Sequence, residues 1–215
     1  LKKHQRYLEQ DLNKLWTKEN IEIIKKKAIL NVDETELLEL LNILNDILKT
    51  NKPPFYFIDL HTTSSQTLPF ITINDALINR RFSKQFPVPI VLGIEEYLHG
   101  PLLSYINQLG YVSLGFESGQ HDAMSAITNS IAFVYLALVY SGVLEEEAVM
   151  GFSKYYEQLK QESQNTFDVF EVVYLHKIER KDTFKMLNGF KSFQKIKKGT
   201  KLAVNNQVEL TSPFN

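Results

Sequence analysis

The run FIDLHTTSS, residues 57–65, changes from apolar to polar residues and carries a histidine, His61. An imidazole at the end of a strand can bind a metal ion, act as a general base or hydrogen-bond a nearby hydroxyl. Asp59 lies two residues earlier, on the same side of a strand, where a carboxylate can orient a metal-bound histidine. Taken alone, His61 fits a hydrogen-bonded structural histidine better than a site, and Asp59 fits a solvated acid equally well.

Glu117 ends a second apolar run, YVSLGFE, just before the chain turns at Gly119. Partial burial raises the pKa of a carboxyl toward the range that suits a general base. The alternative is that Glu117 caps the helix that we expect to begin near Asp122. His121 is close enough in sequence to Glu117 to be a weaker candidate for the same site.

The stretch RYLEQDLNKLW contains Arg6, Asn13 and Lys14, a set that can bind an anion or polarise a carbonyl group. A solvated surface loop is the plainer interpretation of these residues taken alone. His176 and Glu179 form an H-x-x-E string, which binds metal when it lies on a helix. It falls in a β-rich region, where residues three apart point to opposite faces, so we expect no metal site there.

These residues need elements that position them. A capping-box-like start at Asp33 and Glu36, followed by periodic leucines, predicts a helix over residues 31–50. Short apolar runs predict strands, and the segments between them predict helices. We expect Asn74 or Asp75 to cap the helix over residues 74–86. The expected strands are 55–60, 88–94 and 111–117, and the further helices are 74–86, 101–110, 122–142 and 144–163.

Strands alternating with helices predict an α/β fold, with a mostly parallel or mixed sheet flanked by helices. Functional sites of such sheets form at the carboxyl ends of the strands. His61 and Glu117 both lie at predicted strand ends, so we expect them to meet at one edge of the sheet.

The sequence changes character after about residue 164. Short β-rich segments, separated by turn-forming NGF, KKG and NN, predict a small β domain. We therefore expect an α/β catalytic domain over residues 1–163 and a β-rich C-terminal domain over 164–215. The chain begins at Leu1 and stops within a strand-like run, so we expect it to be part of a longer protein with both domains incomplete.

Composition and charge give little support for a nucleic-acid-binding or membrane-binding protein. The formal net charge is -1, which favours neither nucleic acid nor an anionic membrane as a partner. The chain has no cysteine, so a zinc site would have to use His, Asp or Glu. No apolar stretch is long enough to span a membrane and no signal peptide opens the chain, which favours a cytoplasmic protein. The oligomeric state leaves no signal in the sequence.

Four stretches, taken in order, resemble the succinylglutamate desuccinylase/aspartoacylase family, a branch of the zinc carboxypeptidase-like fold. RYLEQDLNKLW resembles its RY…DLNR.F segment, FIDLHTTSS its DLH.T segment and GFESGQ its E.G segment. The stretch YLHKIERKDTFKMLNGFKSFQKIKKGTKLA resembles the C-terminal part of the family. Each string is short, but their order and spacing agree across nearly the whole chain.

The resemblance implies a zinc-dependent hydrolase that removes an acyl group from an N-acyl amino acid or a similar small anionic amide. His61 would be a zinc ligand, and Glu117 the general base that activates the zinc-bound water. Arg6 would polarise the scissile carbonyl. Asn13 and Lys14 would hold a substrate carboxylate. Lys14 stands where the family usually has Arg, so the bidentate fork of a guanidinium is replaced by a point charge.

The resemblance also implies two further zinc ligands, a His and a Glu in an H-x-x-E string ahead of the RY segment. Residues 1–5 contain no such string, because His4 is followed three residues later by Tyr7. We therefore expect both ligands outside the chain as given. Two alternatives stay open: a metal-free relative that only binds a ligand, and a carboxypeptidase-type peptidase. The C-terminal β domain disfavours the peptidase, since in the resembling family it narrows access to the site.

Overall fold

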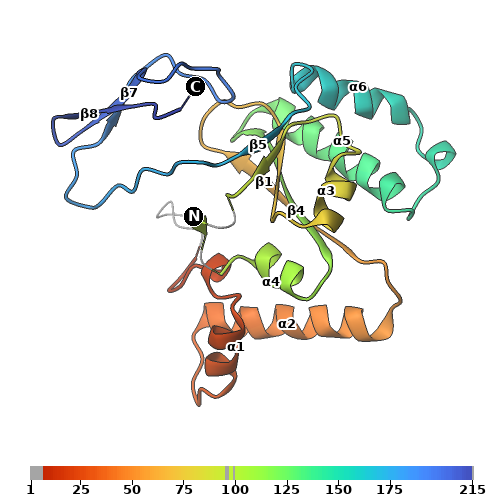
Figure 1. Ribbon diagram of the computed structural model, residues 1–215. Helices are drawn as coiled ribbons and strands as arrows, with labels where there is room; N and C mark the ends of the chain where they lie inside the picture. The colour runs from red at the N-terminus through yellow and green to blue at the C-terminus, as the bar shows by residue number, and fades with distance from the viewer. Residues whose placement is uncertain (1–6, 95–96, 99, 215) are drawn as a thin grey trace.

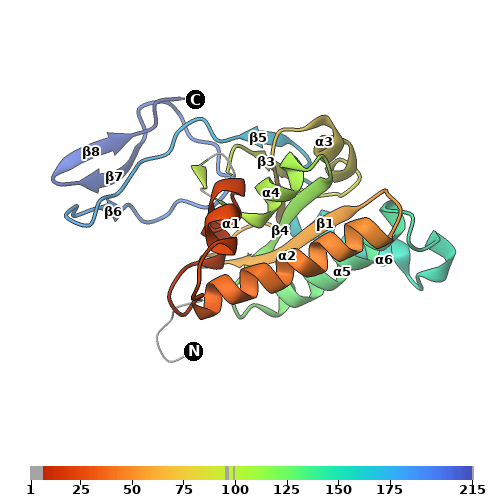
Figure 2. The same ribbon diagram turned by 90° about the horizontal axis from the view of Figure 1, so that it is seen from below.

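The computed structural model describes residues 7–94, 97–98 and 100–214. A mixed sheet has helices on both faces, and a small antiparallel sheet stands apart near the C-terminus (Figures 1 and 2). The strands are β1 Tyr56–Thr63, β2 Phe70–Ile73, β3 Ile90–Leu92, β4 Val112–Gln120, β5 Val169–Glu171, β6 Lys185–Met186, β7 Lys201–Asn205 and β8 Val208–Thr211. The helices are η1 Leu12–Lys14, α1 Lys18–Lys25, α2 Val32–Thr50, α3 Leu77–Ser83, α4 Leu102–Gln108, α5 Met124–Tyr140, η3 Glu146–Ala148 and α6 Phe152–Glu162.

The larger sheet has the strand order β1-β4-β2-β3-β5. All its neighbouring strands are parallel except β2 and β4, which are antiparallel. The expected α/β fold with a mixed sheet is confirmed. Strand β2 was not predicted, because four residues after Pro69 are too few to show a pattern. It reverses the direction of β3 and β5, so the carboxyl end of β3 does not share the edge where β1 and β4 end.

Two apolar cores lie on opposite faces of this sheet. One packs α5, α3 and α6 against the sheet and includes Leu114 and Phe116 of β4. The other joins α1, α2 and α4 around Trp16 and is contacted by Phe57 of β1. The helices of the second core lie together on one side of the sheet in Figure 1, away from α5 and α6. Neighbouring residues of one strand therefore face different cores.

The helix starts differ from those predicted. Helix α2 begins at Val32, and its capping box joins Asn31 to Glu34 rather than Asp33 to Glu36. The error has a physical cause: Asn31 is a strong cap in its own right, and its spacing to Glu34 equals that of the predicted pair. Helix α3 begins at Leu77, with Ala76 at its N-cap and no side-chain cap, so neither Asn74 nor Asp75 caps it.

Residues 144–163 form two helical elements rather than the predicted single helix. The short η3 ends at Ala148, and α6 begins after Gly151, whose φ of 76° is left-handed. A glycine adopts that conformation without a steric penalty, which ends one element and redirects the chain. Elements η1 and α1 were not expected, since they are too short to show a helical period.

The chain after residue 164 first completes the larger sheet, because β5 pairs with β3. Only then does it form the small sheet β6-β7-β8. The segment between the predicted turns NGF and KKG, residues 191–196, was among those expected to be β-rich, but it contains no strand. Its Phe193 ring contacts Phe70 of β2 and Phe170 of β5. The domain boundary between residues 163 and 164 stays a prediction.

Within the described ranges, no helix combines the length and the apolar character that crossing a membrane requires.

Candidate functional site

His61 and Glu117 are register partners on the parallel strands β1 and β4. Leu114 and Phe116 of β4 point to the α5 side of the sheet, so the alternation of side chains turns Glu117 to the opposite side. On β1, Phe57 contacts the core around α2, and His61 follows it by four residues on the same face. The sheet therefore brings both residues to one face and one edge, as the two strand ends predicted.

Asp59 contacts His61 directly. Its Oδ2 atom lies 2.7 Å from the Nε2 atom of His61, and both side chains are a little over one-third exposed. The two residues are separated by one position of β1, which places their side chains side by side on the same face. A carboxylate in this position fixes the orientation and tautomer of the imidazole ring.

Glu117 is a partly buried carboxylate near His61, Asp59 and His121. Its Oε2 atom is buried and has no hydrogen-bond partner within the part of the chain that the structure describes. Burial raises the pKa of Glu117, while the nearby imidazole of His61 counteracts the rise. Glu117 does not cap α5, because that helix begins at Met124 without a side-chain cap. The capping alternative is therefore wrong, and the general-base candidate remains.

His121 lies at the same end of the strand pair. Its Nδ1 atom is 2.7 Å from the hydroxyl of Thr62, and its backbone N–H donates to the carbonyl of Thr63 at 2.8 Å. These contacts tie the turn after β4 to the end of β1. The imidazole also favours the charged form of Glu117 and so lowers its pKa, although burial has the larger effect.

A cavity of about 250 Å³ lies beside His61. Its lining combines two acids, an amide, an imidazole and four apolar side chains: Asp11, Asp59, Asn13, His61, Leu12, Trp16, Leu40 and Leu102. Asn13 belongs to η1, whose first turn is capped by Asp11. The side-chain carbonyl of Asn13 accepts the N–H of Leu102 at 3.3 Å, which links η1 to the start of α4.

Lys14 lines a different cavity, although it follows Asn13 directly. This second cavity, of about 430 Å³, lies among residues of the segment 7–15, of α1 and of α2, and it includes Lys27 and Glu34. Asp11 borders both cavities. The structure thus brings Asn13 to the cavity of His61 and Lys14 to the adjoining one, and their joint role in binding a carboxylate stays a prediction.

Two parts of the predicted site lack a structural test. Arg6 lies outside the described residues. Within residues 7–94, 97–98 and 100–214, no group of three His, Asp or Glu side chains is arranged to hold a metal ion. His176 of the H-x-x-E string instead contacts Tyr174 and Asn205 near the small sheet.

Sequence reasoning did not identify five of the residues that line this cavity: Asp11, Leu12, Trp16, Leu40 and Leu102. Asp11 had a usable signal, since an Asp two residues before Asn13 is typical of a capped turn. Trp16 and Leu40 had none, because apolar residues of short or amphipathic segments are normally assigned to the core.

Comparison with known proteins gives structural relatives only: no family model and no curated protein matches the chain. The match to a succinylglutamate desuccinylase from Silicibacter sp. covers 94% of this chain and 59% of the other, with 12% sequence identity and a TM-score of 0.60. The match to a succinylglutamate desuccinylase from Vibrio parahaemolyticus covers 99% of this chain and 60% of the other, with 12% sequence identity and a TM-score of 0.58. The match to the product-bound ectoine utilization protein EutE (DoeB) from Ruegeria pomeroyi covers 94% of this chain and 60% of the other, with 14% sequence identity and a TM-score of 0.60.

The chain thus spans about 60% of the length of these structures. At such low identity the likeness concerns the fold. The resemblance inferred from the sequence is therefore confirmed in the architecture of the molecule, which has the fold of succinylglutamate desuccinylase structures.

Proposed function

We propose that this protein is a zinc-dependent amide hydrolase that removes the acyl group from an N-acyl amino acid or a similar small anionic amide. One observation carries the proposal: Glu117 and His61 meet at one edge of the sheet, with one carboxylate oxygen of Glu117 buried and unpartnered within the described part of the chain. The fold shared with two desuccinylases supports the same class of reaction.

Glu117 is the proton carrier of the proposed reaction. Burial shifts the pKa of Glu117 toward neutral pH. A general base whose pKa lies closer to the working pH can both accept a proton and return it. A buried oxygen without a described partner would accept a hydrogen bond from a water molecule or a leaving amine that enters the site. Glu117 would take a proton from the attacking water and deliver it to the amine nitrogen.

His61 is the residue of the chain that would hold zinc. Its contact with Asp59 through Nε2 is the arrangement that carboxylates make with metal-bound histidines, and coordination would then use Nδ1. Zinc, when bound, would polarise the carbonyl group and lower the pKa of a water molecule. Catalytic zinc takes three protein ligands, so the proposal assigns the other two to polypeptide outside the described residues.

The substrate would be held from the side of η1. Asn13 lines the cavity of His61 and offers an amide to a carboxylate or carbonyl of the substrate. Lys14 would supply the positive charge from the adjoining cavity, and Arg6 would meet the negative charge that develops on the carbonyl oxygen in the transition state. The four apolar side chains around the cavity suit the hydrocarbon part of a small substrate.

The decisive experiment combines metal analysis with an activity assay on the full-length protein. We expect close to one zinc per chain, and release of the free amino acid from N-acyl amino acids faster than from dipeptides. Preference for dipeptides would instead indicate a carboxypeptidase-type peptidase. Absence of zinc after zinc has been supplied, together with no hydrolysis of either substrate set, would overturn the proposal.

A further inference from the structure

The segment of residues 7–16 carries Asn13 and Trp16 to the cavity of His61, and it is held by few apolar contacts at its beginning. The side chains of Leu8, Glu9 and Gln10 are all exposed. Packing therefore does not determine where residues 8–10 lie, and their position depends on the partners of their backbone.

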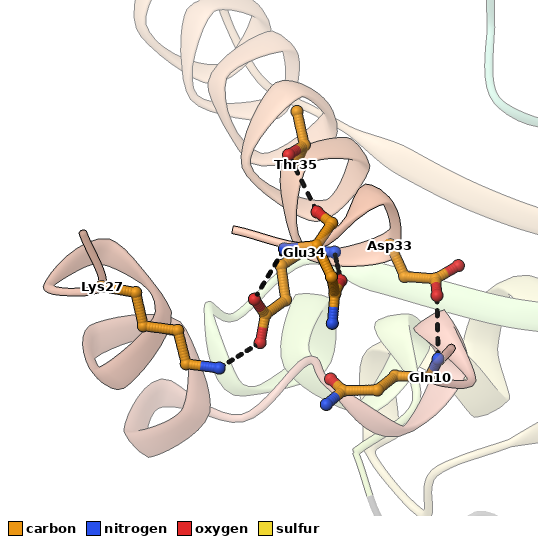
Figure 3. A network of polar contacts seen from close by, with 6 residues as sticks. Gln10, Lys27, Asp33, Glu34 and Thr35 are labelled. Atoms are coloured by element: carbon orange, nitrogen blue, oxygen red, sulfur yellow. Dashed lines mark hydrogen bonds and ion pairs between the residues drawn. The ribbon is translucent and has the colours of Figure 1, made fainter. Parts of the chain in front are cut away.

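Asp33, in the first turn of α2, supplies those partners. Its Oδ2 atom accepts the backbone N–H groups of Glu9 at 2.7 Å and Gln10 at 2.8 Å, and its Oδ1 atom accepts that of Leu8 at 3.3 Å. Asp33 is only 5% exposed. The N–H groups of Gln10 and Glu9 lower the pKa of Asp33, so the carboxylate is charged at neutral pH. Figure 3 shows its contact with Gln10.

The far end of the segment is held by the start of α4. The N–H of Trp16 donates to the carbonyl of Gly100 at 3.0 Å, and Asn13 accepts the N–H of Leu102. Hydrogen bonds thus hold the turn that carries Asn13 on both sides, to the start of α4 on one side and to Asp33 on the other. A change at either attachment is transmitted to Asn13 through only a few residues.

Glu34, the next residue of α2, makes different contacts and so provides a matched comparison. It is 2% exposed, pairs with Lys27 just after α1 and accepts the N–H of Asn31 in the capping box. Figure 3 shows Glu34 reaching toward Lys27, while Asp33 faces Gln10. Two adjacent buried carboxylates therefore fix two different parts of the molecule.

We propose that Asp33 is a positioning residue for substrate binding: by holding the backbone of residues 8–10, it places Asn13 in the cavity of His61. The assignment rests on the proposed function, since it is substrate that Asn13 would meet. It predicts a specific kinetic effect. Asn13 would contact the substrate in the ground state and the transition state alike, so loosening it raises KM and leaves kcat nearly unchanged.

The test compares D33A with D33N and with the control D182N in the full-length protein, by steady-state kinetics and by hydrogen exchange of the peptide 8–16. Alanine leaves no side-chain atom that can accept the N–H groups, whereas asparagine keeps one carbonyl oxygen. We expect D33A to raise KM about tenfold with kcat within about twofold, and to speed exchange of residues 8–10. Asp182 accepts the backbone N–H of Glu179 near the small sheet, so D182N keeps the wild-type KM and the exchange rates of residues 8–10.

D33N, which keeps one amide oxygen as an acceptor, gives an intermediate KM and serves where D33A does not fold. An unchanged KM in a D33A protein with faster exchange would overturn the positioning role. A fall in kcat alone, shared by D33A and D182N, would show a merely structural role and overturn it as well. If the wild-type enzyme hydrolyses no amide, the proposed function fails, whereas the exchange data still decide whether Asp33 holds the segment.

Discussion

His61 and Glu117 face each other across the parallel strands β1 and β4, on the side of the sheet that carries α2 and α4. One residue is oriented by a neighbouring carboxylate, and the other keeps a buried oxygen without a partner among the described residues. An imidazole and a carboxylate in this relation can act on the same small molecule.

Replacement of Glu117 by glutamine removes the proposed general base without changing the size of the side chain. We expect kcat to fall by about 10²- to 10⁴-fold, the usual contribution of general acid–base catalysis. The measurement is amide hydrolysis at saturating substrate, with zinc content as the control. Activity within tenfold of the wild type, at unchanged zinc content, would exclude Glu117 as the base.

Glu117→Gln is also expected to change the thermal stability of the protein. Burial raises the pKa of Glu117, so the charged form is disfavoured in the folded protein. The folded state then binds its proton more tightly than the unfolded state, and stability falls as pH rises above the unfolded pKa. In metal-free protein at pH 7, we expect Glu117→Gln to melt up to about 3 °C higher than the wild type, with no gain at pH 4. Thermal unfolding at the two pH values measures this difference.

Asp59 contacts Nε2 of His61, so on the proposed function its loss would weaken metal binding without removing a ligand. We expect Asp59→Asn to lower zinc affinity about 10- to 100-fold, and His61→Ala to lower it further. Competition with a chelating dye measures both. His176→Ala is the matched control, because His176 contacts Tyr174 and Asn205 near the small sheet. Equal losses in the His61 and His176 variants would contradict a site at His61.

Gly100 allows the close approach of α4 to η1. A Cβ atom there would lie 2.4 Å from the carbonyl oxygen of Lys14, and the φ of Gly100 is +75°. We expect Gly100→Ala to cost about 2–4 kcal/mol, the sum of the left-handed conformation and the clash, and to raise KM by displacing η1. Urea unfolding and steady-state kinetics measure the two effects.

Gly110→Ala is the control for that change. Its φ of +88° gives the same conformational penalty, but a Cβ atom at Gly110 meets nothing within 4 Å. The control is therefore expected to lose about 1–2 kcal/mol with the wild-type KM. A larger loss of stability in Gly110→Ala than in Gly100→Ala would show that the contact with Lys14 is unimportant.

The sequence by itself determined the core of the site. The apolar runs that end at His61 and Glu117 predicted two strands of one α/β sheet, and parallel strands bring their carboxyl ends to one edge. The spacing of Asp59 to His61 already placed the two side chains on one face, because side chains alternate along a strand. These features depend on local periodicity, which a sequence displays directly.

Tertiary structure decided the rest. The reversal of direction at β2, the separation of Asn13 and Lys14 into adjoining cavities, and the attachment of residues 8–10 to Asp33 all join segments that are far apart in the chain. Such contacts have no periodic signature. They depend on which backbone groups remain unpaired once the sheet and helices have formed, and on which buried side chain reaches those groups. Only the folded chain determines these two things.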